Sequence, residues 1–298
     1  MTTELQDTFS VFDRYEAIRD RLPVASGCGR NQAIGSLMDI TDRVDVFVFD
    51  AFGVLNVGET PIPGAAERLD QLRAAGCQIR VLTNAASYDR AGAIAKFKRL
   101  GMTLHDDEII TSREAALTAA GPHHWGVIAA KGDALGDVPG TVTRLGDEVA
   151  DYDAVDGVLF LSAADWNPAR QAKLEAALIH RPRPVLIANA DLVAPRDDGF
   201  SLEPGYFGHL IADRTQAAVS FYGKPFGDVF AMVRATLDGV TAERIAMCGD
   251  SLHTDILGAR VAGWQSVLVT QDGLFAGTDI AAFCARSGIH ADWQLGRI

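Results

Sequence analysis

The sequence predicts an α/β protein with a doubly wound parallel sheet as its core and a smaller α/β domain inserted into that core. Apolar runs of strand length alternate with amphipathic segments of helical length, as they do where crossover helices join parallel strands. The alternation occurs in two blocks, and polar stretches containing Gly and Pro bracket the elements of the second block. We therefore expect both ends of the chain to build the core and the middle to build the insert.

The first block follows a short amphipathic segment, so we expect residues 1–43 to form a helical N-terminal extension. Within the block, the predicted helices end before Gly76 and Gly101, and glycine is typical of the position just after a helix. The predicted elements are strand 44–50, helix 64–75, strand 78–83, helix 87–100 and a strand near 109–110.

The middle of the chain repeats the alternation and predicts the inserted domain. Its elements are strand 125–130, strand 155–161, helix 167–180 and strand 184–189. The core then resumes with helix 209–219, helix 225–237, strand 244–248, helix 254–262 and strand 265–269. We expect a core domain of residues 44–111 and 209–298, and an inserted domain of residues 112–208.

The composition limits the classes of partner. The 298 residues are 48% hydrophobic and 22% charged, as in a soluble globular protein. The net charge of −12 argues against nucleic acid, because a phosphate backbone requires basic surfaces, and it favours a divalent cation as the ionic partner. The first 23 residues mix charged side chains into their apolar positions, so they resemble neither a signal peptide nor a membrane helix. We expect a cytoplasmic protein that binds no membrane.

Polar residues follow the predicted core strands or precede the helices in four places. They are Asp50, the pair Thr83 and Asn84, Lys224, and Asp250 with Asp255. The carboxyl ends of parallel strands meet at one edge of an open sheet, where such proteins bind their ligands. We therefore expect these side chains to form a single site.

The residue types in this site suit phosphoryl transfer. A carboxylate such as Asp50 can attack phosphorus and form an aspartyl-phosphate. Thr83 and Asn84 stand before a helix start, which can bind an anion, and Lys224 supplies a positive charge. Phosphoryl transfer depends mainly on positioning and on charge stabilisation, so Asp50 and Lys224 are the candidate catalytic residues and Thr83, Asn84 and Lys224 the candidate phosphate-binding residues.

The carboxylates also suit Mg²⁺ as a cofactor. This ion prefers octahedral oxygen ligands and usually takes one or two carboxylates together with a substrate phosphate. Asp50, Asp250 and Asp255 are the candidate ligands. Asp255 has an ordinary alternative, because an acidic residue also stabilises the first turn of a helix.

Four sequence motifs occur in a fixed order: FDAFGVLNVG, VLTNA, YGKP and CGDSLHTDILGA. In order and spacing they resemble the four motifs of the haloacid dehalogenase (HAD) superfamily. Two further segments resemble its class IIA branch, which is NagD-like and pyridoxal-phosphatase-like: TSREA and VLIANADLVAPRDDGFSLEPGYFG. The resemblance covers roughly residues 44 to 275.

This resemblance implies a Rossmann-like core, a cap domain inserted between the second and third motifs, and Mg²⁺-dependent hydrolysis through an aspartyl intermediate. Caps of this class often mediate dimers, so it also implies a homodimer through the cap. By position, it implies the nucleophile Asp50, phosphate binding by Thr83, Asn84 and Lys224, and metal ligation by Asp50, Asp250, Asp255 and the backbone carbonyl of Phe52.

Phe52 departs from the pattern of the superfamily's phosphatases. The resemblance implies an aspartate there, which protonates the leaving group and later activates water, and phenylalanine can do neither. General acid–base help is typically worth about 10² to 10⁴-fold in rate, so its loss predicts a slow phosphatase. We expect its substrate to be a small phosphorylated metabolite. Two alternatives stay open: a 2-haloacid dehalogenase, whose halide needs no acid, and a catalytically weak phosphate-binding or regulatory protein.

Three further residues are candidates for contact with the substrate. His253 lies inside the fourth motif, and Asp191 and His209 lie in the segment that joins the insert to the core. The ordinary alternative for Asp191 and His209 is capping and hydrogen bonding within a loop.

Overall fold

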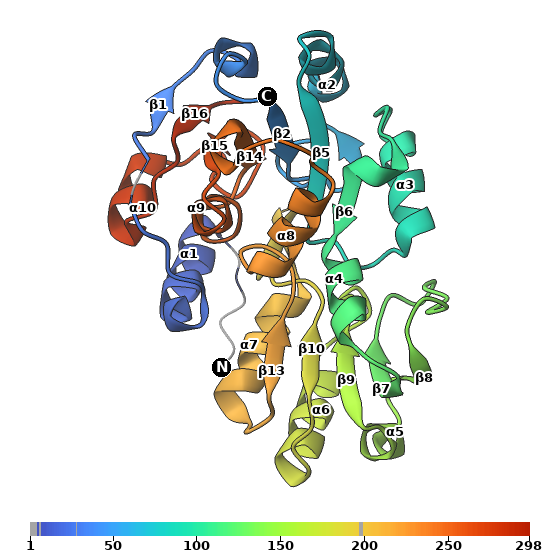
Figure 1. The fold of residues 1–298 in the computed structure, drawn as a ribbon. Helices are drawn as coiled ribbons and strands as arrows, with labels where there is room; N and C mark the ends of the chain where they lie inside the picture. Colours follow the sequence, from blue (N-terminus) through green and yellow to red (C-terminus); the bar gives the residue numbers. More distant parts are fainter. Residues whose placement is uncertain (1–4, 6, 28, 197–198) are drawn as a thin grey trace.

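A computed structural model describes residues 5, 7–27, 29–196 and 199–298. It contains two parallel sheets, each packed with helices, and Figure 1 shows them as an upper core and a lower cap. The core sheet has seven strands in the order β1-β16-β15-β14-β2-β5-β6, and the cap sheet has five in the order β13-β10-β9-β7-β8. The predicted α/β fold class is confirmed.

The strands of the core sheet come from both ends of the chain. They are β1 (Gln32–Ala33), β2 (Val46–Phe49), β5 (Gln78–Thr83), β6 (Ile109–Thr111), β14 (Ile245–Gly249), β15 (Gln265–Val269) and β16 (Trp293–Leu295). The strands of the cap sheet are β7 (His123–Ile128), β8 (Gly140–Arg144), β9 (Gly157–Phe160), β10 (Val185–Ile187) and β13 (Val219–Phe221). Two hairpins complete the strands: β3 (Asn56–Val57) with β4 (Thr60–Pro61), and β11 (Val193–Arg196) with β12 (Gly199–Leu202).

The helices alternate with the strands along most of the chain. They are α1 (Thr8–Ala17), α2 (Ala65–Ala74), α3 (Arg90–Arg99), α4 (Ser112–Ala119), α5 (Val149–Ala154), α6 (Pro168–His180), α7 (Pro204–Arg214), α8 (Gly227–Ala235), α9 (Leu257–Val261) and α10 (Ile280–Ser287). Within the described ranges, no helix combines the length and apolar character needed to cross a membrane.

Strand β2 lies at the centre of the core sheet and is buried throughout. Side chains alternate between the two faces of a strand, and here Phe47 and Phe49 join the apolar cluster of α2 and α3. Val46 and Val48 join the cluster of α8 on the other face. Helices therefore cover both faces of the core sheet, which leaves the carboxyl ends of its strands as the open edge.

The cap differs from the prediction at its C-terminal boundary. The predicted core includes residues 209–298, but β13 pairs in parallel with β10 and extends the cap sheet. The preceding helix also begins earlier than the predicted range 209–219, because α7 starts at Pro204, and proline suits the first position of a helix. The chain therefore returns to the core after β13.

The N-terminal extension is more than a helical addition, because it joins both domains. Strand β1 pairs with β16 at the edge of the core sheet. On α1, Asp13 forms an ion pair of 2.7 Å with Arg286 of the core, and Arg14 forms one of 2.6 Å with Asp213 of the cap. Figure 1 shows α1 between the lower core and α7.

Candidate active site

Asp50 stands directly after β2, at the carboxyl edge of the core sheet. Its Oδ1 accepts a hydrogen bond of 2.7 Å from the backbone N–H of Ala51. The chain then turns through Gly53, which has a φ of +78°. A Cβ at this position would lie 2.5 Å from Oδ2 of Asp250, so glycine permits both the turn and the close approach of the two acidic segments.

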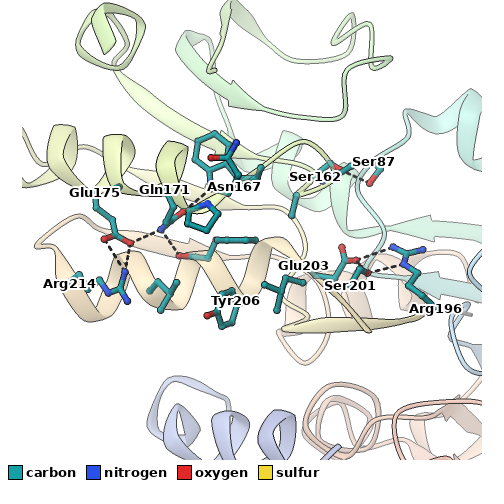
Figure 2. Close-up of a pocket in the computed structure, with 18 residues that line it drawn as sticks. Ser87, Ser162, Asn167, Gln171, Glu175, Arg196, Ser201, Glu203, Tyr206 and Arg214 are labelled. Atoms are coloured by element: carbon teal, nitrogen blue, oxygen red, sulfur yellow. Dashed lines mark hydrogen bonds and ion pairs between the residues drawn. The ribbon is translucent and has the colours of Figure 1, made fainter. Parts of the chain in front are cut away.

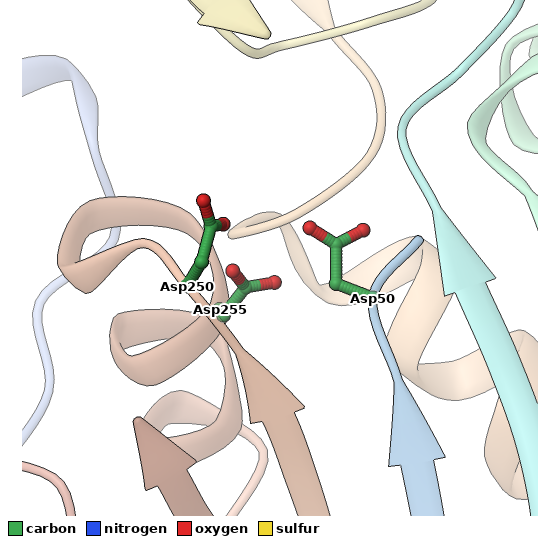
Figure 3. A group of neighbouring side chains, drawn as sticks. All are labelled: Asp50, Asp250 and Asp255. Carbon is green, nitrogen blue, oxygen red and sulfur yellow. The ribbon is translucent and has the colours of Figure 1, made fainter. Parts of the chain in front are cut away.

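Two more carboxylates face Asp50, one from the end of the neighbouring strand β14 and one from the helical turn that follows it (Figure 3). Asp250 follows β14, and its Oδ2 accepts a hydrogen bond of 2.6 Å from the backbone N–H of Leu274. Asp255 lies in the turn before α9, and its Oδ2 accepts a bond of 3.0 Å from the N–H of Ser251. One carboxylate oxygen from each of the three aspartates lies within 4.8 Å of the others.

Lys224 supplies the positive charge of this group. It follows β13, and its side chain is only 1% exposed. Its Nζ lies 2.5 Å from Oδ1 of Asp50 and 2.8 Å from Oδ1 of Asp255. Burial alone would lower the pKa of Lys224, but Asp255 and Asp50 outweigh it and hold the pKa above its usual value. The lysine is therefore charged in the folded protein.

One ammonium group cannot neutralise three carboxylates. Burial, together with the neighbouring carboxylates, raises the pKa of Asp250 well above its usual value, and it also raises the pKa of Asp255. Excess negative charge of this kind is relieved by a cation, and carboxylate oxygens are the ligands that Mg²⁺ prefers. The three aspartates therefore fit a divalent cation.

Asn84 holds Lys224 in place. Its Oδ1 accepts a hydrogen bond of 2.7 Å from the backbone N–H of Lys224, and its Nδ2 donates to the carbonyl oxygen of Lys224 at 2.9 Å. The same Nδ2 donates to Oδ1 of Asp191 in the cap at 2.8 Å. Both amide hydrogens are thus engaged, which makes Asn84 a positioning residue, and its predicted phosphate contact stays a prediction.

A cavity of about 30 Å³ lies above the aspartates and is closed by the cap. Asp50 and Thr83 line it from the core, and Asp191 lines it from the cap. Burial raises the pKa of Asp191 well above its usual range despite the opposing charge of Lys224. The structure therefore brings Asp191, one of the three further candidates, to the site.

Phe52 also lines this cavity, and its ring lies beside two cations. The Nζ of Lys96, on α3, is 4.1 Å from the ring centroid, and the Cζ of Arg196, on β11 of the cap, is 4.8 Å from it. Such cation–π contacts are worth about 0.5 to 2 kcal/mol each. The aromatic side chain that replaces the expected aspartate is therefore part of a defined structure.

Three further residues that line this region are not predicted from the sequence: Lys96, Arg196 and Tyr15. The sequence pattern could have indicated Lys96, because this lysine lies on the apolar face of α3 beside Phe97 and is buried with it. No sequence pattern indicates Arg196 or Tyr15, because only the folded cap and the docked α1 bring them to the site.

The two candidate histidines lie elsewhere. His253 packs against α1, where its Nε2 is 2.6 Å from Oε1 of Glu16 and its ring stacks on Tyr15. His209 stacks on Phe221 inside the cap, with ring centroids 4.2 Å apart. Neither histidine lines the cavity above Asp50. Each packs between secondary structure elements in the described part of the chain.

Comparison with known families assigns the chain to a class. Residues 47–134 match the family of haloacid dehalogenase-like hydrolases, and residues 221–290 match a second family described as HAD-hydrolase-like. The two matches lie on either side of most of the cap, and they include Asp50, Lys224 and Asp250. The chain belongs to the haloacid dehalogenase superfamily of hydrolases, which confirms the resemblance of its motifs.

Individual relatives agree with this assignment. The chain is 29% identical over 227 residues to Haloacid dehalogenase-like hydrolase domain-containing protein 2 of Bos taurus, which covers 74% of this chain and 82% of the relative. It is 28% identical over 252 residues to the glycerol-3-phosphate phosphatase of Homo sapiens, covering 76% and 78%. The 4-nitrophenylphosphatase of Thermotoga maritima shares the fold with a TM-score of 0.67, at 22% identity, covering 87% of this chain and 96% of that one. The protein is a hydrolase of this superfamily.

Proposed function

We propose that the protein is a Mg²⁺-dependent phosphatase that hydrolyses a small phosphorylated metabolite through an aspartyl-phosphate on Asp50. The observation that carries the proposal is the position of the Lys224 Nζ, which lies within 2.8 Å of both Asp50 and Asp255. A buried ammonium beside a carboxylate nucleophile is suited to a phosphoryl group. Relatives named as a glycerol-3-phosphate phosphatase and a 4-nitrophenylphosphatase support the same reaction class.

The geometry assigns separate tasks to the two oxygens of Asp50. Oδ1 is held by the Ala51 N–H and by Lys224, which points to Oδ2 as the attacking oxygen. Its bond to phosphorus forms as the bond from phosphorus to the leaving oxygen breaks. Water then cleaves the aspartyl-phosphate, which releases phosphate and restores the carboxylate. Throughout, Lys224 stabilises the negative charge of the phosphoryl oxygens.

The metal site would be made by Asp50, Asp250, Asp255 and the backbone carbonyl of Phe52. A bound Mg²⁺ would neutralise charge on the phosphoryl oxygens. The chain's own contribution is to fix two of the carboxylates, because backbone N–H groups hold Asp250 and Asp255 in position.

The side chain of Phe52 restricts the leaving group. It has no proton to donate. Hydrolysis is therefore slowed least when the leaving group departs as a stable anion, such as an aryl oxide or a carboxylate. The dehalogenase alternative also needs no acid, but it does not account for three carboxylates gathered around one lysine. That group of charges favours phosphate and a divalent cation.

The test is phosphate release from 4-nitrophenyl phosphate with Mg²⁺ and with a chelator. We expect Mg²⁺-dependent turnover that Asp50→Asn lowers at least about 10³-fold, as losses of a nucleophile do. Asp42→Asn, a change at an exposed aspartate, is the matched control and should leave the rate unchanged. Equal turnover by Asp50→Asn would rule out the covalent route.

The same preparation separates the alternatives. Halide release from a 2-haloacid in the presence of the chelator would indicate a dehalogenase. Binding of phosphate without turnover of any substrate in a metabolite panel would indicate a binding protein. We further propose that the enzyme acts in the cytoplasm, and its homodimerisation through the cap stays a prediction from the resemblance.

A further inference from the structure

A second cavity, of about 230 Å³, lies next to the catalytic cavity. The two cavities share the lining residues Phe52, Asp191 and Ala194. A leaving group that extends past Phe52 from a phosphoryl group at Asp50 would enter this second cavity. Lys96 lines it from the core and Arg196 from the cap.

Lys96 is a buried lysine that forms no ion pair with the described residues. The residue is 4% exposed, and among the described residues no carboxylate lies within ion-pair distance of its Nζ and no hydrogen bond satisfies it. Burial lowers its pKa to about 8. The ring of Phe52 is its nearest recorded partner, and a cation–π contact offsets only part of the cost of burying an ammonium group.

The neighbouring carboxylate Glu203 does not form an ion pair with Lys96. Glu203 is engaged by others, because Arg196 lies 3.1 Å from its Oε1 and the Ser201 hydroxyl donates to the same oxygen at 2.7 Å. Its Oε2 accepts a bond of 3.1 Å from Asn189. Glu59 also lines the cavity, but it lies beyond ion-pair distance of Lys96. Among the described residues, Lys96 is therefore the cation of this cavity that has no ion pair, and an anionic ligand can supply one.

We propose that the leaving group of the substrate carries a second anionic group, a carboxylate or a phosphate, that binds Lys96 beside Phe52. Arg196 lies over the same ring and is the second cation of this subsite. The inference rests on the proposed phosphatase function and names its substrate class: small phosphate esters or anhydrides with a second negative group.

Beyond Arg196 there is room for a longer leaving group. A cavity of about 460 Å³ in the cap shares Ser87, Arg196 and Glu203 with the second cavity. Figure 2 shows Arg196, Ser201 and Glu203 grouped at one end of it. The subsite therefore lies between the reacting phosphorus and this larger space.

The binding test uses two phosphonates that cannot be hydrolysed, phenylphosphonate and 4-carboxyphenylphosphonate, measured by calorimetry with Mg²⁺ present. We expect the intact protein to bind the carboxylated compound at least about tenfold more tightly, as a desolvated charge pair permits. Lys96→Met should remove this preference, and Lys96→Arg should keep most of it. Lys98→Met, at an exposed lysine of the same helix, is the control and should keep all of it.

Arg196→Met is a second variant that does not depend on the buried lysine. Its side chain is 38% exposed, so the change is tolerated more easily, and we expect a loss of about threefold in the preference. Equal binding of the two phosphonates by the intact protein would overturn the subsite. A preference that survives Lys96→Met would also overturn it.

The outcomes for the subsite and for the phosphatase reaction are distinguishable. A carboxylate preference without turnover of any phosphate ester would overturn the reaction and keep the subsite. Turnover of 4-nitrophenyl phosphate without a carboxylate preference would keep the reaction and overturn the subsite.

Discussion

The two sides of the active site differ in their functional side chains and come from different parts of the molecule. The phosphate side consists of three aspartates and Lys224, and the aspartates follow strands of the core sheet. The leaving-group side consists of Phe52, Lys96 and Arg196, which come from a loop and a helix of the core and from a hairpin of the cap. The first gathers carboxylates and suits a metal, whereas the second places two cations over one aromatic ring and is where we propose that an anion binds.

This difference separates reaction from selection. The aspartates of the phosphate side belong to the core, and in the proposed reaction this side contacts only the phosphoryl group. The leaving-group side exists only when the cap lies on the core, because Arg196 reaches Phe52 from the cap. In the proposed reaction, substrate selection at this subsite therefore depends on cap closure, as it does in enzymes whose lids complete the site.

The largest expected effect comes from the phosphate side. Lys224→Met removes the positive charge between Asp50 and Asp255, so the phosphoryl group meets uncompensated carboxylates. We expect kcat/KM for 4-nitrophenyl phosphate to fall by about 10² to 10³-fold, with weaker inhibition by inorganic phosphate. Steady-state kinetics with thermal unfolding as a check on folding would measure both.

Lys131→Met, at an exposed lysine of the cap, is the matched control for that change. It removes the same charge from the molecule at a distance from the aspartates. If both variants kept their rate within twofold of the original protein, the phosphate side would not depend on Lys224.

A smaller effect is expected at the boundary between the two sides. Phe52→Asp restores an acid next to the leaving group, and we expect turnover of glycerol 3-phosphate to rise by about 10²-fold, because its alkoxide needs a proton. Turnover of 4-nitrophenyl phosphate should rise much less. The new carboxylate would also compete for Lys96, so the preference for carboxylated ligands should fall.

Phe52→Asn is the control, since it has nearly the shape of aspartate and no acid. Equal rates for the asparagine and aspartate variants on glycerol 3-phosphate would contradict acid catalysis at position 52. The leaving-group side would then be adapted to its phenylalanine rather than merely lacking an acid.

The smallest expected effect is on how the free energy of unfolding of the protein depends on pH, through His209 in the cap. Burial, followed by the charge of Arg21, lowers the pKa of His209 in α7 to about 3. The unfolded chain binds this proton near pH 6.5, so the contribution of His209 to stability is complete above that pH and declines as pH falls toward 3. The free energy of unfolding should fall by up to about 1.4 kcal/mol per pH unit in this window from this residue.

His209→Phe removes the titrating group and keeps a ring that can stack on Phe221. Urea unfolding at pH 7, 6 and 5 should therefore give a shallower pH dependence for this variant than for the original protein. The same pH dependence of the free energy of unfolding for both proteins would show that the buried histidine does not make stability depend on pH.

The core was predictable because its pattern is local. Strand β2 is a continuous apolar run, β5 and β15 match their predicted ranges, and Asp50 and Asp250 each follow a strand directly. The neighbours β14 and β2 pair in parallel, so Asp50 and Asp250 had to meet once both strands formed. Chain order and sheet geometry were sufficient for the phosphate side.

The leaving-group side was not predictable for the opposite reason. Residue 96 lies on a helix and residue 196 lies on a hairpin 100 positions later, and no repeat or spacing links them. The predicted domain boundary at residue 208 was wrong for a similar reason, because the three residues of β13 are too short a run to show which sheet they join. Such pairings depend on how whole domains dock.

The position of α1 has a mechanical consequence. The chain crosses between core and cap twice, after β6 and after β13, and two crossings define a hinge axis. Helix α1 adds a third attachment, since Asp13 and Glu16 bind the core while Arg14 binds Asp213 of the cap. A body attached at three points does not rotate about a single axis, so the cap can swing open only when α1 detaches from one of the two domains.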